Sequence, residues 1–126
     1  MPLPPVTPLS CNNADLHPED IVQSTQPLQL LDVRSRFEYN RFHAPGAINL
    51  SLPRILMGQV SILRRWVWPS WFLNLSKDEP IALICLTVHR SPIAAKALSD
   101  LGFRQVFNVT GGMMAWQKAG LPIEKS

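Results

Sequence analysis

Cysteine and long apolar runs are both scarce in this sequence. Cys11 and Cys85 are its only cysteines, too few to build the disulfide framework of a small secreted scaffold. No stretch approaches the roughly 20 uncharged apolar residues that a membrane-spanning helix needs. Residues 1–12 contain neither a basic leader nor an apolar core, which argues against a secretory signal. We therefore expect a cytoplasmic protein with no membrane span and with a free thiol at Cys85.

Concentrated positive charge is also absent. The chain has 12 basic and 9 acidic residues, but the basic ones are scattered, and Arg64 and Arg65 are the only adjacent pair. Nucleic-acid-binding proteins usually concentrate lysine and arginine on one element, so we expect small anions rather than nucleic acid as partners. The sequence has no histidine and cysteine cluster at metal-ligand spacing and no glycine-rich nucleotide loop. We therefore expect no metal and no cofactor.

The chain does have enough apolar residues for one compact domain, because hydrophobic residues make up 46% of its 126 residues. Four prolines in the first eight residues favour an extended arm over residues 1–13, so the domain is expected over residues 14–126. Strands are expected near residues 28–33, 47–50, 81–84 and 106–109, and helices near residues 15–23, from 35, near 92–101 and near 112–118. This alternation predicts an α/β fold with a central, mostly parallel sheet flanked by helices on both faces.

Two of these elements have strong local signals. The strand at residues 81–84 consists of four consecutive apolar residues, as expected for a strand buried on both faces of a parallel sheet. The helix from residue 35 begins with Ser35, and Glu38 three residues later completes a capping box. In such a box each side chain bonds the backbone of the other residue and so stabilises the start of the helix.

Cys85 lies in the most informative part of the sequence. It directly follows the strand at 81–84 and precedes a helix that begins near Ser91. Ligands of open α/β sheets bind beyond the carboxyl ends of the strands. Loop amides, the helix dipole and Arg90 would favour the nucleophilic thiolate there. By position alone, Cys85 could instead be a buried apolar residue that ends a strand.

Three motifs, in the same order, resemble those of the single-domain rhodaneses, a family of sulfurtransferases. The first is LLDVRSRFEYNRFHAPGAINL at residues 30–50, which resembles the family's Asp-Val-Arg, Glu-Tyr and His-x-Pro-Gly-Ala-Ile-Asn run. The second is the loop from Cys85 to Ser91, with Arg-Ser at the fifth and sixth positions after the cysteine. The third is GFRQVFNVTGGMMAWQKAGLPI at residues 102–123. The resemblance covers most of residues 30–123 and implies a rhodanese-like fold.

The resemblance also implies a two-step sulfur transfer. The Cys85 thiolate would take the sulfane sulfur of an anionic donor such as thiosulfate, and a thiol, a cyanide-like nucleophile or a protein acceptor would remove it from the persulfide. Arg90 would bind the anionic donor, because its fork can donate two charge-assisted hydrogen bonds. The alternatives are that Arg90 caps a helix or pairs with a carboxylate. The other residues expected to bind the donor, through loop amides and the threonine hydroxyl, are Leu86, Thr87, Val88, His89 and Ser91.

Five residues around this site have more limited or open roles. Asp32, Arg34 and His43 are expected to support the site rather than to act in it. His89 could tune the thiolate, or it could point to solvent from the loop. Val88 stands where the family usually has glycine. Because valine is poorly suited to positive φ, we expect Val88 to keep a negative φ and the loop to be somewhat opened at that position.

Two other functions fit parts of this pattern. Phosphatases and arsenate reductases of a related fold have a Cys-to-Arg loop one residue longer, which can surround a tetrahedral phosphate. Here Arg90 is the fifth residue after Cys85, a spacing that favours a single sulfur atom. Many rhodanese-like interaction modules lack the cysteine, whereas this chain has it. Val88 nevertheless leaves a catalytically weak or inactive interaction module as the main alternative.

Residues 53–75 match no motif and show no single apolar period, so we expect helical pieces broken at Pro69. Three of the four tryptophans lie in this segment, together with Phe72. Because a small domain has limited core to absorb them, residues 61–75 are expected to contain an apolar surface beside the active-site mouth. The alternative is that these side chains pack as a helical cover over the sheet.

Overall fold

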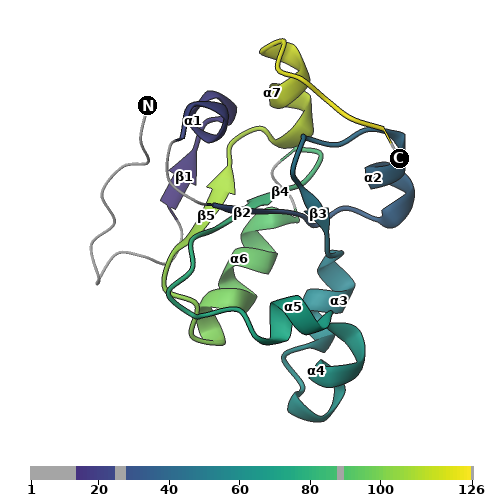
Figure 1. Cartoon of the computed structure of the whole chain (residues 1–126), viewed down its shortest axis with the longest axis vertical. Coiled ribbons are helices and arrows are strands. Elements are labelled where there is room, and N and C mark those ends of the chain that lie inside the picture. The colour runs from purple at the N-terminus through teal and green to yellow at the C-terminus, as the bar shows by residue number, and fades with distance from the viewer. Residues whose placement is uncertain (1–13, 25–27, 88–89, 126) are drawn as a thin grey trace.

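The computed structural model describes residues 14–24, 28–87 and 90–125. Its centre is a five-stranded sheet in the order β1-β5-β4-β2-β3, in which every neighbouring pair is parallel (Figure 1). The strands are β1 (Ala14–Leu16), β2 (Gln29–Asp32), β3 (Ile48–Asn49), β4 (Ile81–Ile84) and β5 (Val106–Val109). The predicted α/β fold with a parallel sheet is confirmed. The proline-rich arm predicted for residues 1–13 lies outside the described residues.

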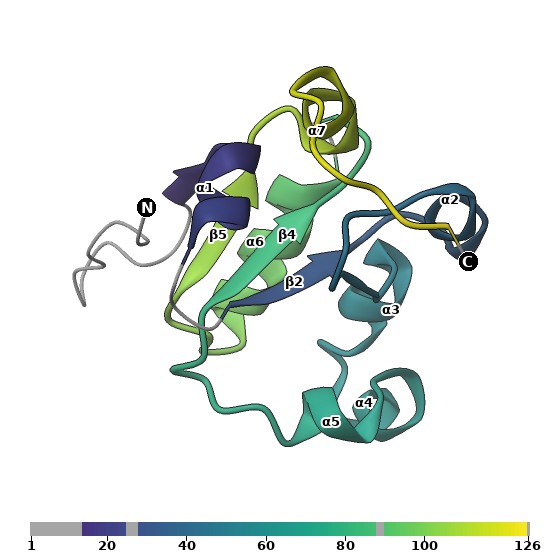
Figure 2. The same cartoon turned by 45° about the horizontal axis from the view of Figure 1, so that its top comes forward.

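Helices cover both faces of the sheet (Figures 1 and 2). In the described part of the chain they are α1 (Pro18–Gln23), α2 (Arg36–Arg41), α3 (Leu52–Met57), α4 (Ser61–Val67), α5 (Ser70–Leu73), α6 (Ser91–Asp100) and α7 (Gly112–Lys118). On one face, α5 and α6 pack through Phe72 and Leu98, with α3 beside them. On the other face, α1, α2 and α7 pack through Ile21, Tyr39 and Trp116. None of these helices is long and apolar enough to cross a membrane.

Local sequence signals account for two of these elements. Ser35 caps α2 as predicted, because its Oγ accepts the Glu38 N–H at 3.2 Å and Glu38 Oε1 accepts the Ser35 N–H at 3.1 Å. All four residues of β4 are buried, and they alternate between the core clusters on the two faces of the sheet. The capping box and the doubly buried strand are therefore both confirmed.

The strand β1 differs from the sequence-based expectation, which placed a helix over residues 15–23. Residues 14–16 instead form an edge strand, with Leu16 opposite Val109 of β5, and the helix begins only at Pro18. A three-residue strand is too short to show a recognisable apolar pattern. Its conformation depends on pairing with a segment near the other end of the chain, which local sequence does not encode.

The strand order reverses between β2 and β4. From β2 the chain continues to the edge strand β3, whereas β4 is followed by β5 on its other side. The carboxyl ends of β2 and β4, at Asp32 and Ile84, are therefore neighbours, and the Val33 N–H donates to Ile84 O at 2.9 Å. Such a reversal is a topological switch point, where ligands of open α/β sheets bind.

Part of the tryptophan-rich segment covers one face of the sheet. Trp68 and Phe72 are buried, and their rings meet edge to face with centroids 4.7 Å apart. Phe72 also stacks on Phe103, which follows α6. The helical pieces of this segment are interrupted at Pro69, as predicted, with α4 before it and α5 after it.

Another part of the segment exposes apolar side chains. Ile62 and Trp66, one turn apart on α4, are 77% and 84% exposed. Of the four aromatic side chains on which the predicted apolar surface rested, only Trp66 is exposed, whereas Trp68 and Phe72 are buried and Trp71 is half-buried. The alternative, a helical cover over the sheet, therefore describes most of this set. In both views α4 lies at the end of the molecule opposite α7 (Figures 1 and 2).

Trp68 and Trp66 allow a matched test of this arrangement. Trp68→Ala should lower the free energy of unfolding by about 3–5 kcal/mol, because it leaves a cavity beside Gly58 and removes the Nε1–H bond to Arg54 O. Trp66→Ala changes only an exposed side chain and should alter the value by less than about 0.5 kcal/mol. Urea unfolding measures both, and similar losses in the two variants would contradict the described packing.

Candidate active site

Cys85 stands immediately after β4, at the switch point. It is 1% exposed, and its Sγ lies 3.7 Å from the Oγ of Ser91, the first residue of α6. Ser91 is also buried. The amino end of a helix carries partial positive charge, and α6 is ten residues long. The sulfur therefore lies where a hydroxyl and a helix end can both stabilise negative charge.

The amino end of α7 holds the loop that follows Cys85. The Met113 N–H donates to Cys85 O at 2.7 Å, and the Met114 N–H donates to Leu86 O at 3.0 Å. Gly112, with a φ of +58°, permits this approach, because a Cβ there would overlap carbonyl oxygens of the loop. The N–H and C=O of a planar trans peptide point in opposite directions, so these bonds turn the following loop amides away from α7. This contact was not predicted from the sequence.

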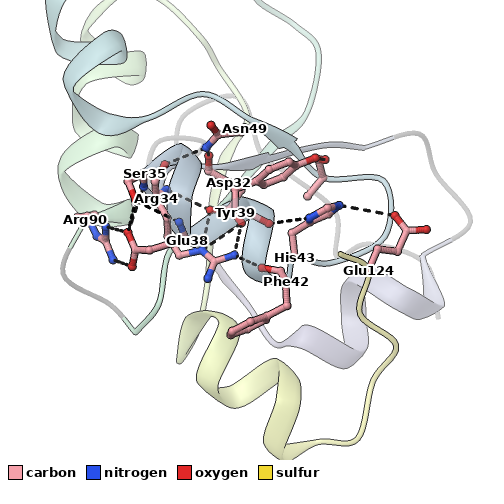
Figure 3. Close-up of polar contacts among 11 residues, drawn as sticks. Asp32, Arg34, Ser35, Glu38, Tyr39, Phe42, His43, Asn49, Arg90 and Glu124 are labelled. Carbon is pink, nitrogen blue, oxygen red and sulfur yellow. Dashed lines mark hydrogen bonds and ion pairs between the residues drawn. The ribbon is translucent and has the colours of Figure 1, made fainter. Parts of the chain in front are cut away.

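Arg90 is bound by a carboxylate. Its Nη1 donates to Glu38 Oε1 at 2.6 Å, and its Nη2 donates to Glu38 Oε2 at 3.0 Å (Figure 3). The hydrogen-bonded guanidinium lowers the pKa of Glu38 from 4.5 to about 2, so the carboxylate stays charged. The structure thus shows Arg90 paired with a carboxylate, which was one of the alternatives to binding an anionic donor. Sequence reasoning identified Glu38 only as the partner of Ser35 in the capping box and as part of the Glu-Tyr motif.

Asp32 and Arg34 form a buried ion pair at the carboxyl end of β2. The Arg34 Nη2 donates to Asp32 Oδ2 at 2.8 Å and to Phe42 O at 2.6 Å, and its Nε donates to Asp32 Oδ1 at 2.9 Å. Asn49 Nδ2 donates to the backbone oxygens of Asp32 at 3.0 Å and Arg34 at 2.8 Å. These bonds connect the end of β2 to the end of α2 and to β3 (Figure 3). Such contacts suit the supporting role expected for the pair.

His43 lies at the opposite end of this polar network from Arg90 (Figure 3). Its Nδ1 is 2.9 Å from Tyr39 O, and its ring stacks on the Tyr39 ring with centroids 3.9 Å apart. The backbones of His43 and Glu124 exchange two N–H to O bonds of 2.8 Å each. Burial raises the pKa of Tyr39 above its ordinary value. These contacts fix the C-terminal segment against α2.

The remaining loop residues are described in part. Leu86 and Thr87 are half-buried in the loop after Cys85. Val88 and His89 lie outside the described residues. The φ predicted for Val88 and the two alternatives for His89 therefore stay predictions. Within residues 14–24, 28–87 and 90–125, no group of three or more His, Cys, Asp or Glu side chains is placed to hold a metal ion.

A pocket of about 390 Å³ lies at the switch point. It is lined by Val33, Ser35, Arg36, Ser51, Leu52, Pro53 and Arg90. These residues come from the end of β2, the starts of α2 and α3, and the loop before α6. Because Val33 binds Ile84, the residue before Cys85, the pocket borders the strand end that carries the thiol. Arg36 was not among the predicted site residues, since its sequence position is that of an ordinary surface arginine.

The apolar surface on α4 is remote from this site. The loop that follows Cys85 is bound to α7, whereas α4 lies at the other end of the molecule (Figures 1 and 2). The expectation that the surface lies beside the active-site mouth is therefore wrong. The physical reason is that α3 begins at the pocket and leads the chain away from it before α4 forms.

The fold and the site agree with a known family. The family model of the rhodanese-like domain matches residues 19–119. The chain therefore belongs to the rhodanese-like domain family, as the three sequence motifs indicated.

Three similar proteins illustrate the relationship. The thiosulfate sulfurtransferase GlpE of Vibrio cholerae is 26% identical over 113 residues, covering 89% of this chain and 93% of that protein. A Bacillus subtilis protein described as a sulfur carrier, YrkF, is 33% identical over 95 residues, covering 75% of this chain and 44% of YrkF. The crystal structure of a rhodanese-related protein from Thermoplasma volcanium is 27% identical, with a TM-score of 0.68, covering 90% of this chain and 99% of that one. The matched region thus spans less than half of YrkF and nearly all of GlpE.

The pair between Arg90 and Glu38 should make stability depend on pH. The folded-state pKa of Glu38, about 2, lies below its ordinary value of 4.5, so the contribution of the pair is present above pH 4.5 and is lost as the pH falls toward 2. Glu38→Gln keeps the capping box but should lower the free energy of unfolding at pH 7 by roughly 1 kcal/mol. Urea unfolding of the parent and the variant should show this difference shrinking below pH 4.5. A difference that does not change with pH would contradict the assigned pair.

Gly112 and Gly120 allow a matched test of the contact between α7 and the loop. Both have positive φ, but only Gly112 faces loop carbonyls, whereas a Cβ at Gly120 meets nothing within 4 Å. Gly120→Ala should lower the free energy of unfolding by about 1 kcal/mol through backbone strain alone. Gly112→Ala should lower the free energy of unfolding by at least about 2 kcal/mol more than Gly120→Ala does, because the loop must move. Equal losses on urea unfolding would show that α7 does not hold the loop this closely.

Proposed function

We propose that this chain is a sulfurtransferase that carries sulfur as a persulfide on Cys85. The observation that carries the proposal is the place of the Cys85 thiol, which follows β4 at the switch point and lies against the amino end of α6. Relatives named as a thiosulfate sulfurtransferase and as a sulfur carrier support the same chemistry. A reducing compartment such as the cytoplasm would keep this thiol free.

The reaction consists of two balanced displacements. In the first, the Cys85 thiolate attacks the sulfane sulfur of an anionic donor such as thiosulfate, a new S–S bond forms, and sulfite leaves with the electron pair of the broken bond. In the second, a thiolate or cyanide attacks the outer sulfur of the persulfide, and Cys85 leaves as a thiolate. The products are an acceptor persulfide or thiocyanate. No external oxidant or reductant takes part.

The loop supplies stabilisation for the negative charge on sulfur. Because α7 takes the carbonyls of Cys85 and Leu86, the loop amides turned away from α7 are available to an anion on the other side. The Ser91 hydroxyl is within 3.7 Å of the sulfur, and the Thr87 hydroxyl is a further donor in the same loop. Donors held in place before the reaction stabilise developing charge more than solvent does.

Arg90 contributes in a different way from the one the motif suggested. It lines the pocket, but Glu38 binds both of its terminal nitrogens and offsets its charge. In this proposal Arg90 therefore positions the end of the loop and attracts an anionic donor less than an unpaired arginine would. Asp32, Arg34 and His43 support the strand end and α2 from behind the site.

An interaction module without catalysis is the second candidate, favoured by the valine at position 88 of the loop. A phosphatase or arsenate reductase has less support, because Arg90 is the fifth residue after Cys85 and the loop is one residue shorter than in those enzymes. One set of measurements separates the three functions.

Intact-mass spectrometry tests the persulfide directly. Incubation with thiosulfate should add about 32 Da to the chain, and cyanide should then remove this mass as thiocyanate. Cys11→Ser should behave like the parent. Cys85→Ser should lose both the mass gain and thiocyanate formation, because serine is far less nucleophilic than a thiolate.

Each other outcome points to a different conclusion. Sulfur uptake that persists in Cys85→Ser would refute the assignment of Cys85. Hydrolysis of an aryl phosphate without sulfur uptake would favour a phosphatase. The absence of both activities in the parent would favour the interaction module.

A further inference from the structure

The switch-point pocket contains two arginines, and only one of them is paired. Arg90 is bound by Glu38 through both terminal nitrogens. Arg36, the first residue of α2, also lines the pocket, but its side chain forms no hydrogen bond or ion pair with another residue that the structure describes. The uncompensated positive charge of the pocket therefore belongs to Arg36.

The rest of the lining is compatible with a small oxyanion. Ser51 brings a hydroxyl group, whereas the Ser35 hydroxyl donates to Glu38 Oε1, and the other neutral residues form an apolar wall. None of the described residues that line the pocket is acidic. Glu38, two residues after Arg36 on α2, carries a carboxylate whose charge is compensated by Arg90. A volume of about 390 Å³ is in the range of pockets that bind small molecules.

The pocket also has the right relation to the sulfur. Arg36 lies just beyond β2 and Cys85 just beyond β4, and these two strands are hydrogen-bonded neighbours with parallel register. Val33, between them, lines the pocket and binds the backbone of Ile84, the residue before Cys85. Arg36 and Cys85 therefore follow two neighbouring strands at the same edge of the sheet, although Cys85 itself does not line the pocket.

We infer that Arg36 binds the oxyanion end of the sulfur donor and selects anionic donors for this site. The inference rests on the proposed function and adds to it the residue that recognises the donor. A guanidinium fork can donate two parallel hydrogen bonds to two oxygens of a sulfonate-like group. The sulfane sulfur at the other end of the donor is then free to meet the Cys85 thiolate, and the sulfite left after transfer departs from Arg36.

The first experiment measures binding without chemistry. All variants carry Cys85→Ser in the 126-residue chain, so that they cannot accept sulfur. Thiosulfate is titrated by calorimetry into the chain with Arg36→Gln, with Arg36→Lys and with Arg36 unaltered. Arg36→Gln should weaken thiosulfate binding about tenfold, the loss expected for charged hydrogen bonds at an accessible site, and Arg36→Lys should weaken it less. Arg41→Gln is the matched control, because Arg41 ends the same helix but does not line the pocket. It should bind thiosulfate as the unaltered chain does.

The second experiment probes the Cys85 thiol without sulfur transfer. In a Cys11→Ser background, Cys85 is alkylated by the anionic reagent iodoacetate and by its uncharged counterpart iodoacetamide. If Arg36 attracts anions to this thiol, Arg36→Gln should lower the ratio of the iodoacetate rate to the iodoacetamide rate about tenfold. Arg41→Gln should leave the ratio unchanged. The urea midpoint of each variant checks that the fold is retained.

The outcomes for Arg36 and for sulfur transfer are separable. Equal thiosulfate binding and equal alkylation ratios in Arg36→Gln and Arg41→Gln would overturn the role of Arg36, even if the parent forms a persulfide. Conversely, if the parent takes up no sulfur but Arg36→Gln still loses thiosulfate binding, the proposed function fails and the anion site at Arg36 stands.

Discussion

The geometry of the site depends on one carboxylate, that of Glu38. It accepts the Ser35 N–H at the start of α2 and two N–H groups of Arg90 at the end of the loop after β4. Because one charged side chain makes all of these bonds, the start of α2 and the loop are held in one fixed relation. The same pairing uses the Arg90 charge within the scaffold, so that the free positive charge of the pocket is left to Arg36.

Polar contacts hold the walls of the crevice from two directions. On the β2 side, burying Asp32 and Arg34 carries a desolvation cost that the pair offsets only because further hydrogen bonds satisfy both groups. These are the bond from the Arg34 guanidinium to Phe42 O and the bond from the Arg34 N–H to Asp32 Oδ1. Asn49 in addition binds the backbone oxygens of Asp32 and Arg34, so three segments of backbone are joined. On the β4 side, two backbone amides of α7 hold the loop after Cys85. The described backbone beside Cys85 is therefore held by hydrogen bonds to other elements of the protein.

Local patterns were enough to predict much of the fold. The apolar strand at residues 81–84, the strand at 106–109 and the helix at 112–118 were predicted at their observed positions. The capping box at Ser35 was predicted together with both of its bonds. Each of these depends on residues within a turn or a strand length of each other. The strand β1 and the position of the exposed α4 surface were missed, because both depend on how distant segments pack.

The sequence by itself determined the family, the parallel sheet and the candidacy of Cys85, because these follow from apolar patterns and motifs that are continuous along the chain. Only the tertiary structure decided what each arginine near the site does. Arg34, Arg36 and Arg90 have the same side chain, and their differences come from burial and from their partners. Arg34 is buried against Asp32, Arg90 is paired with Glu38, and Arg36 has no charged partner among the described residues. The Asp32 partner of Arg34 lies two residues away, but Glu38 and Arg90 are 52 positions apart and meet only because β2 and β4 end side by side at the switch point, a relation that no local stretch of sequence contains.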